Sequence, residues 1–361
     1  MKTYTYKIKS VDHSFEEKFS QWIGTCRFVY NSAKELKQLS YRMGSPLTNN
    51  TIQKQLTQAK KEIDFVRVVN SQTLQAILDR LDRAYKSFYN GGGYPKWASK
   101  DKWNTIPFKS IKYRGEGKFF LPSWGDINVF LSRKFNGELR TANIKKEVDG
   151  YYLQVVTDEN PNINQNDNQV SIDLGLKYFY VSSDGEYIGN PNHFKKYERQ
   201  LRIEQRSLSR KKKGSNNWEK QLDRVRKTHL KIKRVRKDFL HKLSTQLAKD
   251  YNVVFCEDLS VNNMIKNPKL SKSISDCGWS MFVNMLSYKT NVVKVDPKYT
   301  SQECSECGFV SRGNRLTQSK FKCISCGYSE NADFQATKNI MKRGQSLLCD
   351  NVEVVNSCVA Q

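Results

Sequence analysis

Four cysteines near the C-terminus constrain the fold of this chain more than any other feature. Cys304, Cys307, Cys323 and Cys326 form two Cys-x-x-Cys pairs separated by fifteen residues. Each pair can supply two thiolates to one zinc ion, and the gap is long enough to bring the second pair back to that ion. Four thiolates leave no open position on zinc for a substrate. We therefore expect a structural zinc ribbon, and any chemistry must come from other residues.

The chain has 361 residues and a large excess of positive charge. Lysine and arginine number 61 against 36 aspartates and glutamates, which gives a formal net charge of +25. Nucleic acid is the usual partner of such an excess, because neutralised phosphates release their counterions. The alternative is a basic protein without a specific partner.

No segment of the sequence resembles a membrane-spanning helix. Such a helix needs about 20 apolar residues, and no stretch approaches that length. The N-terminus also lacks the apolar run of a signal peptide. We expect a protein with no membrane partner that is cytoplasmic and associated with the nucleoid.

The first part of the chain alternates between strand and helix patterns. Residues 3–9 alternate as a strand does, and apolar residues at helical spacing follow until a run of three glycines. Short β-like segments separated by Gly, Asp, Asn and Pro come next. The pattern predicts a small β-barrel or sheet built from residues 1–13 and 94–166, with a helical bundle, residues 14–93, inserted into it.

The second part reads as an α/β domain with an insertion. A polar stretch at 159–168 is predicted to be a linker, and apolar strands and long helices follow it. We predict that the α/β domain comprises residues 167–298 and 331–345 and is interrupted by the zinc ribbon, residues 299–330. The remainder, residues 346–361, shows little pattern and is predicted to be a loose tail.

A basic turn joins the two long helices predicted in this second part. It contains Arg210, Lys211, Lys212 and Lys213. Such a turn is either the solvated tip of a helical hairpin or a contact to phosphate. The net charge of the chain favours the phosphate contact.

Three acids stand at the ends of predicted elements rather than on solvated helix faces. Asp173 lies inside an apolar strand, Glu257 ends another strand, and Asp333 begins the last helix. A carboxylate among apolar residues is costly unless a partner compensates it. Magnesium or manganese would do so, and two such ions about 4 Å apart can cleave phosphodiesters. The alternatives are a surface position for each acid, a helix-capping role for Asp333, and Asp258 in place of Glu257.

Short motifs spread over nearly the whole chain carry a resemblance to a known family. They lie at residues 26–31, 94–97, 171–175, 239–244, 257–259, 299–308 and 331–340. In these motifs the chain resembles the TnpB family of transposon-encoded RNA-guided nucleases, also described as OrfB-type transposases, which are relatives of the type V CRISPR effectors.

The resemblance implies a multidomain α+β protein. Its N-terminal part would be a wedge β-barrel with an inserted helical recognition bundle, followed by a RuvC-type, ribonuclease H-like α/β nuclease domain with an inserted zinc ribbon. Asp173, Glu257 and Asp333 match the acids of the three RuvC motifs and would bind Mg²⁺ or Mn²⁺. A guide RNA from the transposon end would pair with one strand of double-stranded target DNA beside a short motif. Cleavage would leave a 5′-phosphate and a 3′-hydroxyl.

Two departures from the family pattern concern the efficiency of cleavage. Gln335 and Thr337 stand where the family usually has Asn and Ala, and the segment 286–293 is shorter than usual.

The alternative function is that of a programmable DNA-binding repressor, as in the family branch that has lost its acids, but the three acids here are intact. A strand-joining transposase is a weaker reading, because no tyrosine stands beside a paired-histidine motif. The number of copies in the working complex is left open.

Overall fold

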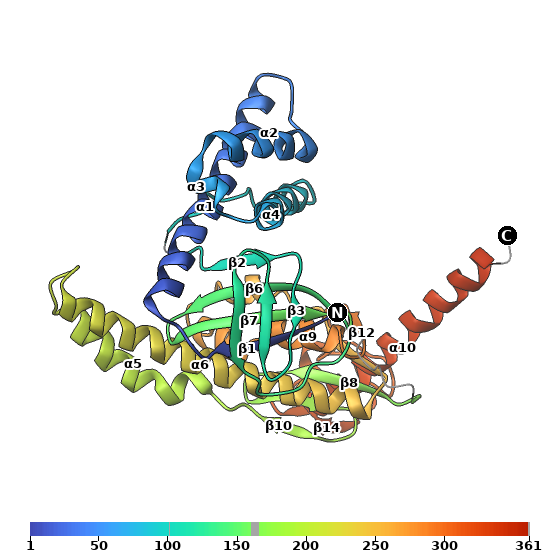
Figure 1. Cartoon of the computed structure of the whole chain (residues 1–361). Coiled ribbons are helices and arrows are strands. Elements are labelled where there is room, and N and C mark those ends of the chain that lie inside the picture. Colours follow the sequence, from blue (N-terminus) through green and yellow to red (C-terminus); the bar gives the residue numbers. More distant parts are fainter. Residues whose placement is uncertain (101, 160–165, 360–361) are drawn as a thin grey trace. The chain divides into compact units, whose positions relative to one another are not determined.

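The computed structural model describes residues 1–100, 102–159 and 166–359, with no account of the side chains after residue 349. The chain divides into two compact units, Met1–Asn160 and Pro161–Gln361 (Figure 1). Of the predicted linker at 159–168, residues 160–165 lie outside the described part.

An antiparallel seven-stranded sheet organises the first unit. The strand order is β2-β6-β7-β1-β5-β4-β3. Strand β1 pairs with β5 on one side and with β7 on the other, although both follow it by more than a hundred residues. The helices between β1 and β2 are therefore an insertion in the sheet. The strands are β1 (Lys2–Ile8), β2 (Thr105–Phe108), β3 (Lys112–Tyr113), β4 (Lys118–Leu121), β5 (Gly125–Phe130), β6 (Leu139–Glu147) and β7 (Gly150–Thr157).

The inserted helices share one apolar core with this sheet. Helix α1 is a single helix of 30 residues, and α2, α3 and α4 gather around the half of it that lies away from the sheet (Figure 1). Trp22 of α1 is fully buried and stacks on Phe108 of β2. The helices are α1 (His13–Arg42), α2 (Asn49–Glu62), α3 (Asp64–Arg67) and α4 (Ser71–Tyr89).

A five-stranded mixed sheet forms the centre of the second unit. Its order is β10-β9-β8-β11-β12. Three of its strands follow one another in the chain and are antiparallel neighbours: β8 (Gln169–Leu174), β9 (Tyr178–Ser182) and β10 (Tyr187–Gly189). Strand β11 (Val253–Glu257) lies parallel to β8, and β12 (Asn291–Val295) lies parallel to β11.

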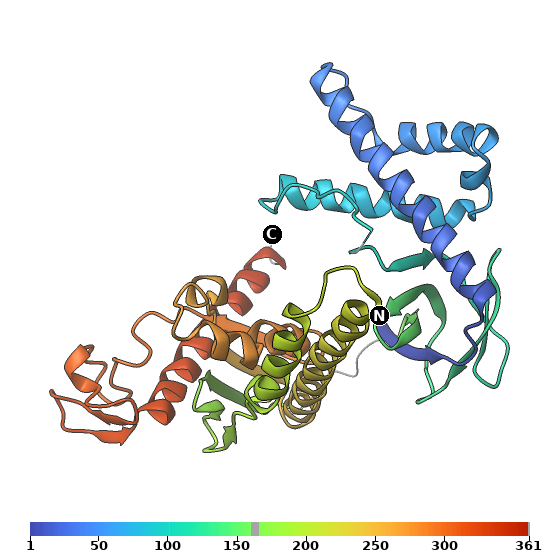
Figure 2. The same ribbon diagram turned by 90° about the vertical axis from the view of Figure 1, so that its left-hand side faces the viewer.

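Helices cover both faces of this sheet. Val170, Ile172 and Leu174 of β8 pack with residues of α6 (Asn216–Asp250) and α9 (Trp279–Ser287). Side chains alternate along a strand, so Ser171 and Asp173 face the opposite side, where α10 (Ala332–Val359) lies. Figure 2 shows α5 (His193–Ser209) and α6 side by side as a hairpin. Smaller elements are α7 (Val261–Met264), α8 (Ser271–Cys277), η1 (Arg312–Asn314), β13 (Lys320–Lys322) and β14 (Ser329–Asn331).

Helix α10 corrects the expectation for the end of the chain. The residues after Gly344, predicted to be loose, continue the helix to Val359, and residues 360 and 361 lie outside the described part. The helix continues through Gly344, and the glycine serves the packing of the helix against the sheet. A Cβ at this position would lie 2.0 Å from the ring of Phe255 in β11. The glycine therefore lets the helix approach the sheet closely.

The mixed α/β composition with several sheets confirms the coarse fold prediction. Within the described ranges, no helix combines the length and apolar character needed to cross a membrane.

Candidate active site

Two of the three predicted acids are neighbours on adjacent strands. Cys256 of β11 pairs with Ile172 of β8, so the residues that follow them, Glu257 and Asp173, come next to each other in the parallel register. Phe255 packs against Ile340 of α10, and Glu257 lies two residues further along the same face. The sheet thus presents both carboxylates on the side covered by α10.

The third acid reaches this face from the start of α10. Asp333 is the second residue of the helix. The side chain of Asn331 accepts hydrogen bonds from the backbone N–H groups of Asp333 (3.0 Å) and Phe334 (3.3 Å). Asn331 therefore caps the helix, and the carboxylate of Asp333 is not needed for that role.

Burial governs the electrostatics of the three acids. Burial raises the pKa of Asp173 to about 7, with a further contribution from the negative charges of Glu257 and Asp333. Burial also raises the pKa values of Glu257 and Asp333. Among the described residues, the four cysteines are the only group of three or more possible ligands whose ligand atoms all lie within 4.8 Å of one another, so the three carboxylates as a set are spread more widely than that. Oxygen donors of this kind suit a hard divalent cation.

Asp258, the competitor of Glu257, lies elsewhere. Its side chain is exposed and pairs with Lys294 at 2.9 Å. The strand alternation that turns Glu257 toward α10 turns its neighbour away.

A cation that the sequence did not single out lies beside the acids. The guanidinium of Arg315, in the cysteine-rich insertion, is 3.4 Å from Asp333 and donates to the carbonyl of Gln318. Its positive charge opposes the rise in pKa of all three acids. No local signal distinguishes this arginine among 61 basic residues, because its position depends on the fold of the insertion.

The four cysteines form the predicted cluster. The Sγ atoms of Cys304 and Cys326 are 3.7 Å apart, and those of Cys307 and Cys323 are 3.5 Å apart. A tetrahedron of Zn–S bonds near 2.3 Å requires about 3.8 Å between sulfurs, so the cluster fits zinc.

Two equivalent turns hold these cysteines. The N–H of Gly308 donates to the carbonyl of Cys304, and that of Gly327 donates to the carbonyl of Cys323. Both glycines have a positive φ, +72° and +77°, which side chains disfavour. A backbone N–H bond from Cys326 lowers the pKa of Cys323, which favours the thiolate that a metal needs.

The two departures in the last motif have structural partners. Gln335 is fully buried, donates to the carbonyl of Glu303 at 2.7 Å and accepts from the hydroxyl of Ser305 at 2.8 Å. Thr337 is also fully buried, and its carbonyl accepts a 2.7 Å bond from Ser171 of β8. The glutamine thus joins α10 to the cysteine-rich insertion, and neither side chain leaves a polar atom without a partner.

The basic turn lies between α5 and α6, at the tip of their hairpin (Figure 2). Arg210, Lys212 and Lys213 are exposed and Lys211 is half-buried. Within the described part of the chain, none of the four forms a salt bridge, so their charges remain available to an external anion.

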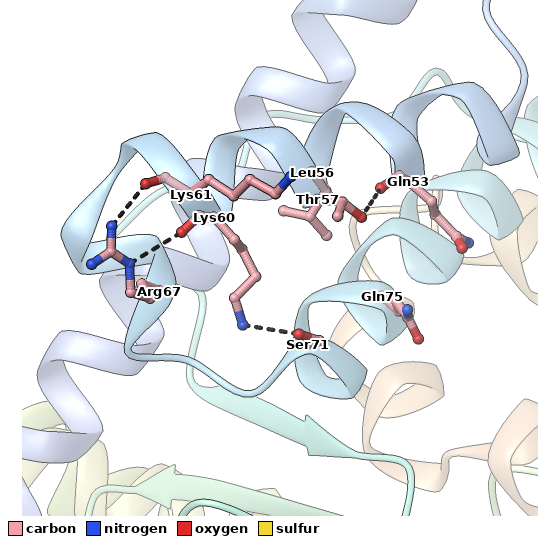
Figure 3. A pocket seen from close by; sticks show the side chains of 8 residues that line it. All are labelled: Gln53, Leu56, Thr57, Lys60, Lys61, Arg67, Ser71 and Gln75. Atoms are coloured by element: carbon pink, nitrogen blue, oxygen red, sulfur yellow. Dashed lines mark hydrogen bonds between the residues drawn. The ribbon is translucent and has the colours of Figure 1, made fainter.

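A polar hollow of about 520 Å³ lies between helices of the first unit (Figure 3). The ammonium of Lys60 reaches from α2 to the hydroxyl of Ser71 (2.9 Å) and the carbonyl of Val69 (2.7 Å). Burial lowers the pKa of this lysine. The lining residues are Gln53, Leu56, Thr57, Lys60, Lys61, Arg67, Ser71 and Gln75.

Three family models match separate parts of the chain. The model described as "Probable transposase", for OrfB of IS605, covers residues 152–268, and a "Cas12f1-like, TNB domain" model covers residues 279–340. A model described as "Helix-turn-helix domain" covers residues 1–45. In this structure residues 1–45 contain strand β1 and the single long helix α1.

Full-length relatives and a solved structure agree with these matches. An Escherichia coli (strain K12) protein named "Putative RNA-guided DNA endonuclease InsQ" is 31% identical over 91% of this chain and 89% of its own length. A Streptomyces pristinaespiralis protein of the same description is 30% identical over 95% and 89%. The cryo-EM structure of a Cas12f1–sgRNA–target DNA complex matches the fold with a TM-score of 0.56 and 15% identity, over 91% of this chain and 83% of that one.

The match in fold and the domain model at residues 279–340 define the class as proteins with a Cas12f1-like fold. Within that class, the chain belongs to the TnpB family, as the identity to full-length relatives shows and as the motifs in the sequence predicted.

Proposed function

We propose that this protein is an RNA-guided DNA endonuclease whose active site comprises Asp173, Glu257 and Asp333. The relatives that match nearly the whole chain carry the name of that activity. The observation that ties the activity to these residues is the juxtaposition of two acids in register on the sheet with a third at the start of α10. Burial, and then the charges of the other two acids, raises the pKa of Asp173 to about 7. Buried carboxylates without a bound cation lower the stability of the fold, and groups with perturbed pKa values of this kind are typical of functional sites.

The sheet supports a RuvC-type, ribonuclease H-like assignment. Three antiparallel strands are followed by two parallel ones in the order β10-β9-β8-β11-β12, with helices on both faces. We retain the proposed domains: a wedge barrel (1–13 and 94–166), a recognition bundle (14–93), and a nuclease domain (167–298 and 331–345) interrupted by the ribbon (299–330).

The three acids would hold Mg²⁺ or Mn²⁺, which would supply water activation and stabilisation of the leaving oxygen. Asp173 and Glu257 offer adjacent oxygens from neighbouring strands, and Asp333 approaches from the helix. Arg315 lies close enough to Asp333 to contact a phosphate bound at the acids. The four cysteines would hold a structural Zn²⁺, consistent with their sulfur separations.

Guide RNA and double-stranded target DNA are the proposed partners, and the net charge of +25 suits them. The solved relative of similar fold contains an sgRNA and a target DNA. The basic turn, Arg210 to Lys213, is a proposed phosphate contact. The hollow around Lys60 offers amide, hydroxyl and ammonium groups of the kind that contact phosphates and base edges (Figure 3). A protein that acts on chromosomal DNA would work in the cytoplasm at the nucleoid.

The test begins with copurification of the chain with RNA from its own locus. The sequenced RNA defines a guide, and the complex is then incubated with Mg²⁺ and DNA that carries the guide's match beside randomised flanking bases. We expect cutting that depends on both the match and the flank.

Substitutions assign the cutting to the proposed site. Asp173→Ala, Glu257→Ala and Asp333→Ala should each abolish cutting while DNA binding persists. Asp258→Ala is the matched control, because it removes the same charge one residue from Glu257 and should cut normally. Specific DNA retention without cutting by the unchanged protein would favour the repressor, and cutting that survives Asp173→Ala would refute the assigned site.

A further inference from the structure

A buried threonine holds the carboxylate of Glu257. Thr300 is only 2% exposed, and its hydroxyl lies 2.5 Å from Oε1 of Glu257 and 3.0 Å from the carbonyl of Pro297. A hydroxyl has a single proton to donate. The carboxylate of Glu257 is the closer of the two groups and the stronger acceptor, because hydrogen bonds to charged groups are about twice as strong as neutral ones. One oxygen of Glu257 is therefore fixed by this bond.

The backbone around Thr300 is held in an unusual conformation. Tyr299 has a φ of +66°, in the left-handed region that bulky side chains disfavour. Its carbonyl accepts from the N–H groups of Gln302 (2.9 Å) and Glu303 (3.0 Å), which close a tight turn. Conformations of this kind persist only where the surroundings enforce them, and they cluster at functional sites.

One face of α10 enforces this turn. Gln335, Asn339 and Arg343 are spaced by four residues, so they lie above one another on the helix. Asn339 is 2% exposed, and its amide donates to the carbonyls of Thr300 (2.8 Å) and Glu303 (2.7 Å). Gln335 donates to the same Glu303 carbonyl.

Arg343 forms the remaining contacts of α10 with residues 296–303. Its guanidinium donates to the carbonyls of Asp296 (3.0 Å) and Lys298 (2.7 Å) and pairs with the carboxylate of Glu303 at 2.5 Å. Helix α10, whose second residue is Asp333, therefore fixes residues 296–303 at several points along its length.

From this network we infer that Thr300 is a positioning residue for Glu257, and that α10 sets the position of Thr300 through Asn339. The bond to Oε1 restricts the rotation of the carboxylate and leaves Oε2 as the oxygen for a divalent cation. The helix thus supplies one acid directly and orients a second through Thr300. This inference rests on the proposed nuclease function, because it assigns Glu257 to the metal-binding set.

The experiment compares three threonine variants. Thr300→Val keeps the shape and removes the hydroxyl, and Thr300→Ser keeps the hydroxyl. Thr290→Val is the matched control. Thr290 is equally buried (2%), and its hydroxyl lies 2.7 Å from the backbone carbonyl of Asn252 and 3.0 Å from that of Tyr251, at the opposite end of β12 from the acids.

Two quantities are measured on the guide-loaded protein. The first is the rate of DNA cleavage over a range of Mg²⁺ concentrations. The second is the affinity for Mn²⁺, followed by electron paramagnetic resonance without any turnover. Loss of a side chain that orients a metal ligand typically costs 10- to 100-fold in activity or metal affinity, so we expect Thr300→Val to lose about that factor in both. Thr300→Ser should recover most of it, and Thr290→Val should resemble the unchanged protein.

Three results would overturn the inference. Thr300→Val could cut and bind Mn²⁺ normally, Thr300→Ser could be as impaired as Thr300→Val, or Thr290→Val could show the same loss, which would indicate a general packing effect. If the unchanged protein does not cut its DNA, the proposed function fails instead, and the Mn²⁺ affinities still decide the role of Thr300.

Discussion

The pKa of Asp173 leads to a testable dependence of stability on pH. The folded carboxyl has a pKa of about 7 against an ordinary value of 3.8, mainly because of burial and then because of Glu257 and Asp333. The folded state therefore binds more protons than the unfolded state between about pH 4 and pH 7, and the free energy of unfolding should fall as pH rises through that window. At about 1.4 kcal/mol per pKa unit, the full cost at pH 8 is about 4 kcal/mol in the presence of a chelator.

Asp173→Asn removes this cost while it keeps the size of the side chain. In chelator at pH 8, we expect the variant to be more stable than the unchanged protein by about 4 kcal/mol, and at pH 4 the two should be similar. Added Mg²⁺ should stabilise the unchanged protein more at pH 8 than at pH 5, because protons and the cation compete for the same oxygens.

Hydrogen exchange of peptides from β8 and β11 reports on the local stability around Asp173 without interference from the first unit. Asp258→Asn serves as the control, because that exposed carboxylate should change exchange little at either pH. Equal protection of the Asp173→Asn variant and the unchanged protein at pH 8 in chelator would refute the view that the ionised carboxylate of Asp173 destabilises the folded state.

Three further predictions concern other parts of the chain. Gly344→Ala should lower the free energy of unfolding by about 1 to 3 kcal/mol in denaturant titrations, because its Cβ would overlap the ring of Phe255. A gain of about 1 kcal/mol would instead indicate that helix propensity dominates. Replacing Arg210 to Lys213 by serine should reduce the slope of log affinity against log salt for nucleic acid by about 3, and an unchanged slope would exclude the turn as a phosphate contact. Cys307→Ser, or removal of zinc, should abolish hydrogen-exchange protection in residues 299–330, and full protection without metal would contradict a structural zinc site.

Local patterns were sufficient to predict the major elements of the nuclease half. Alternating apolar residues predicted β8, and helical spacing predicted α5 and α6 with the basic turn between them. The cysteine spacing predicted the four-sulfur cluster, because the ligand geometry of zinc is encoded in short turns. These features depend on neighbours in the sequence.

Features that depend on distant contacts were not accessible in the same way. The end of the chain showed little pattern, and the role of Gly344 is explained only by the ring of Phe255 on a strand almost ninety residues earlier. Asp258 and Glu257 were equivalent candidates until the pleat of β11 separated their faces. Arg315 carried no signal, and Thr300 was only one residue of the motif at 299–308, because the role of a single arginine or threonine becomes visible only once the fold has placed it beside a carboxylate.

The cysteine-rich insertion connects these observations to the site. Four thiolates exclude catalysis at the zinc itself, so the sequence favoured a ribbon that only holds local structure. The structure shows that the insertion lies between β12 and α10 and that its first residues include Thr300, which bonds to Glu257, while Arg315 lies beside Asp333. Gln335, buried where the family usually has Asn, bonds to Glu303 and Ser305 near the first cysteines. Because the same segment that folds around the cysteines also places groups against two of the three acids, the order of the ribbon and the geometry of the active site should be lost together.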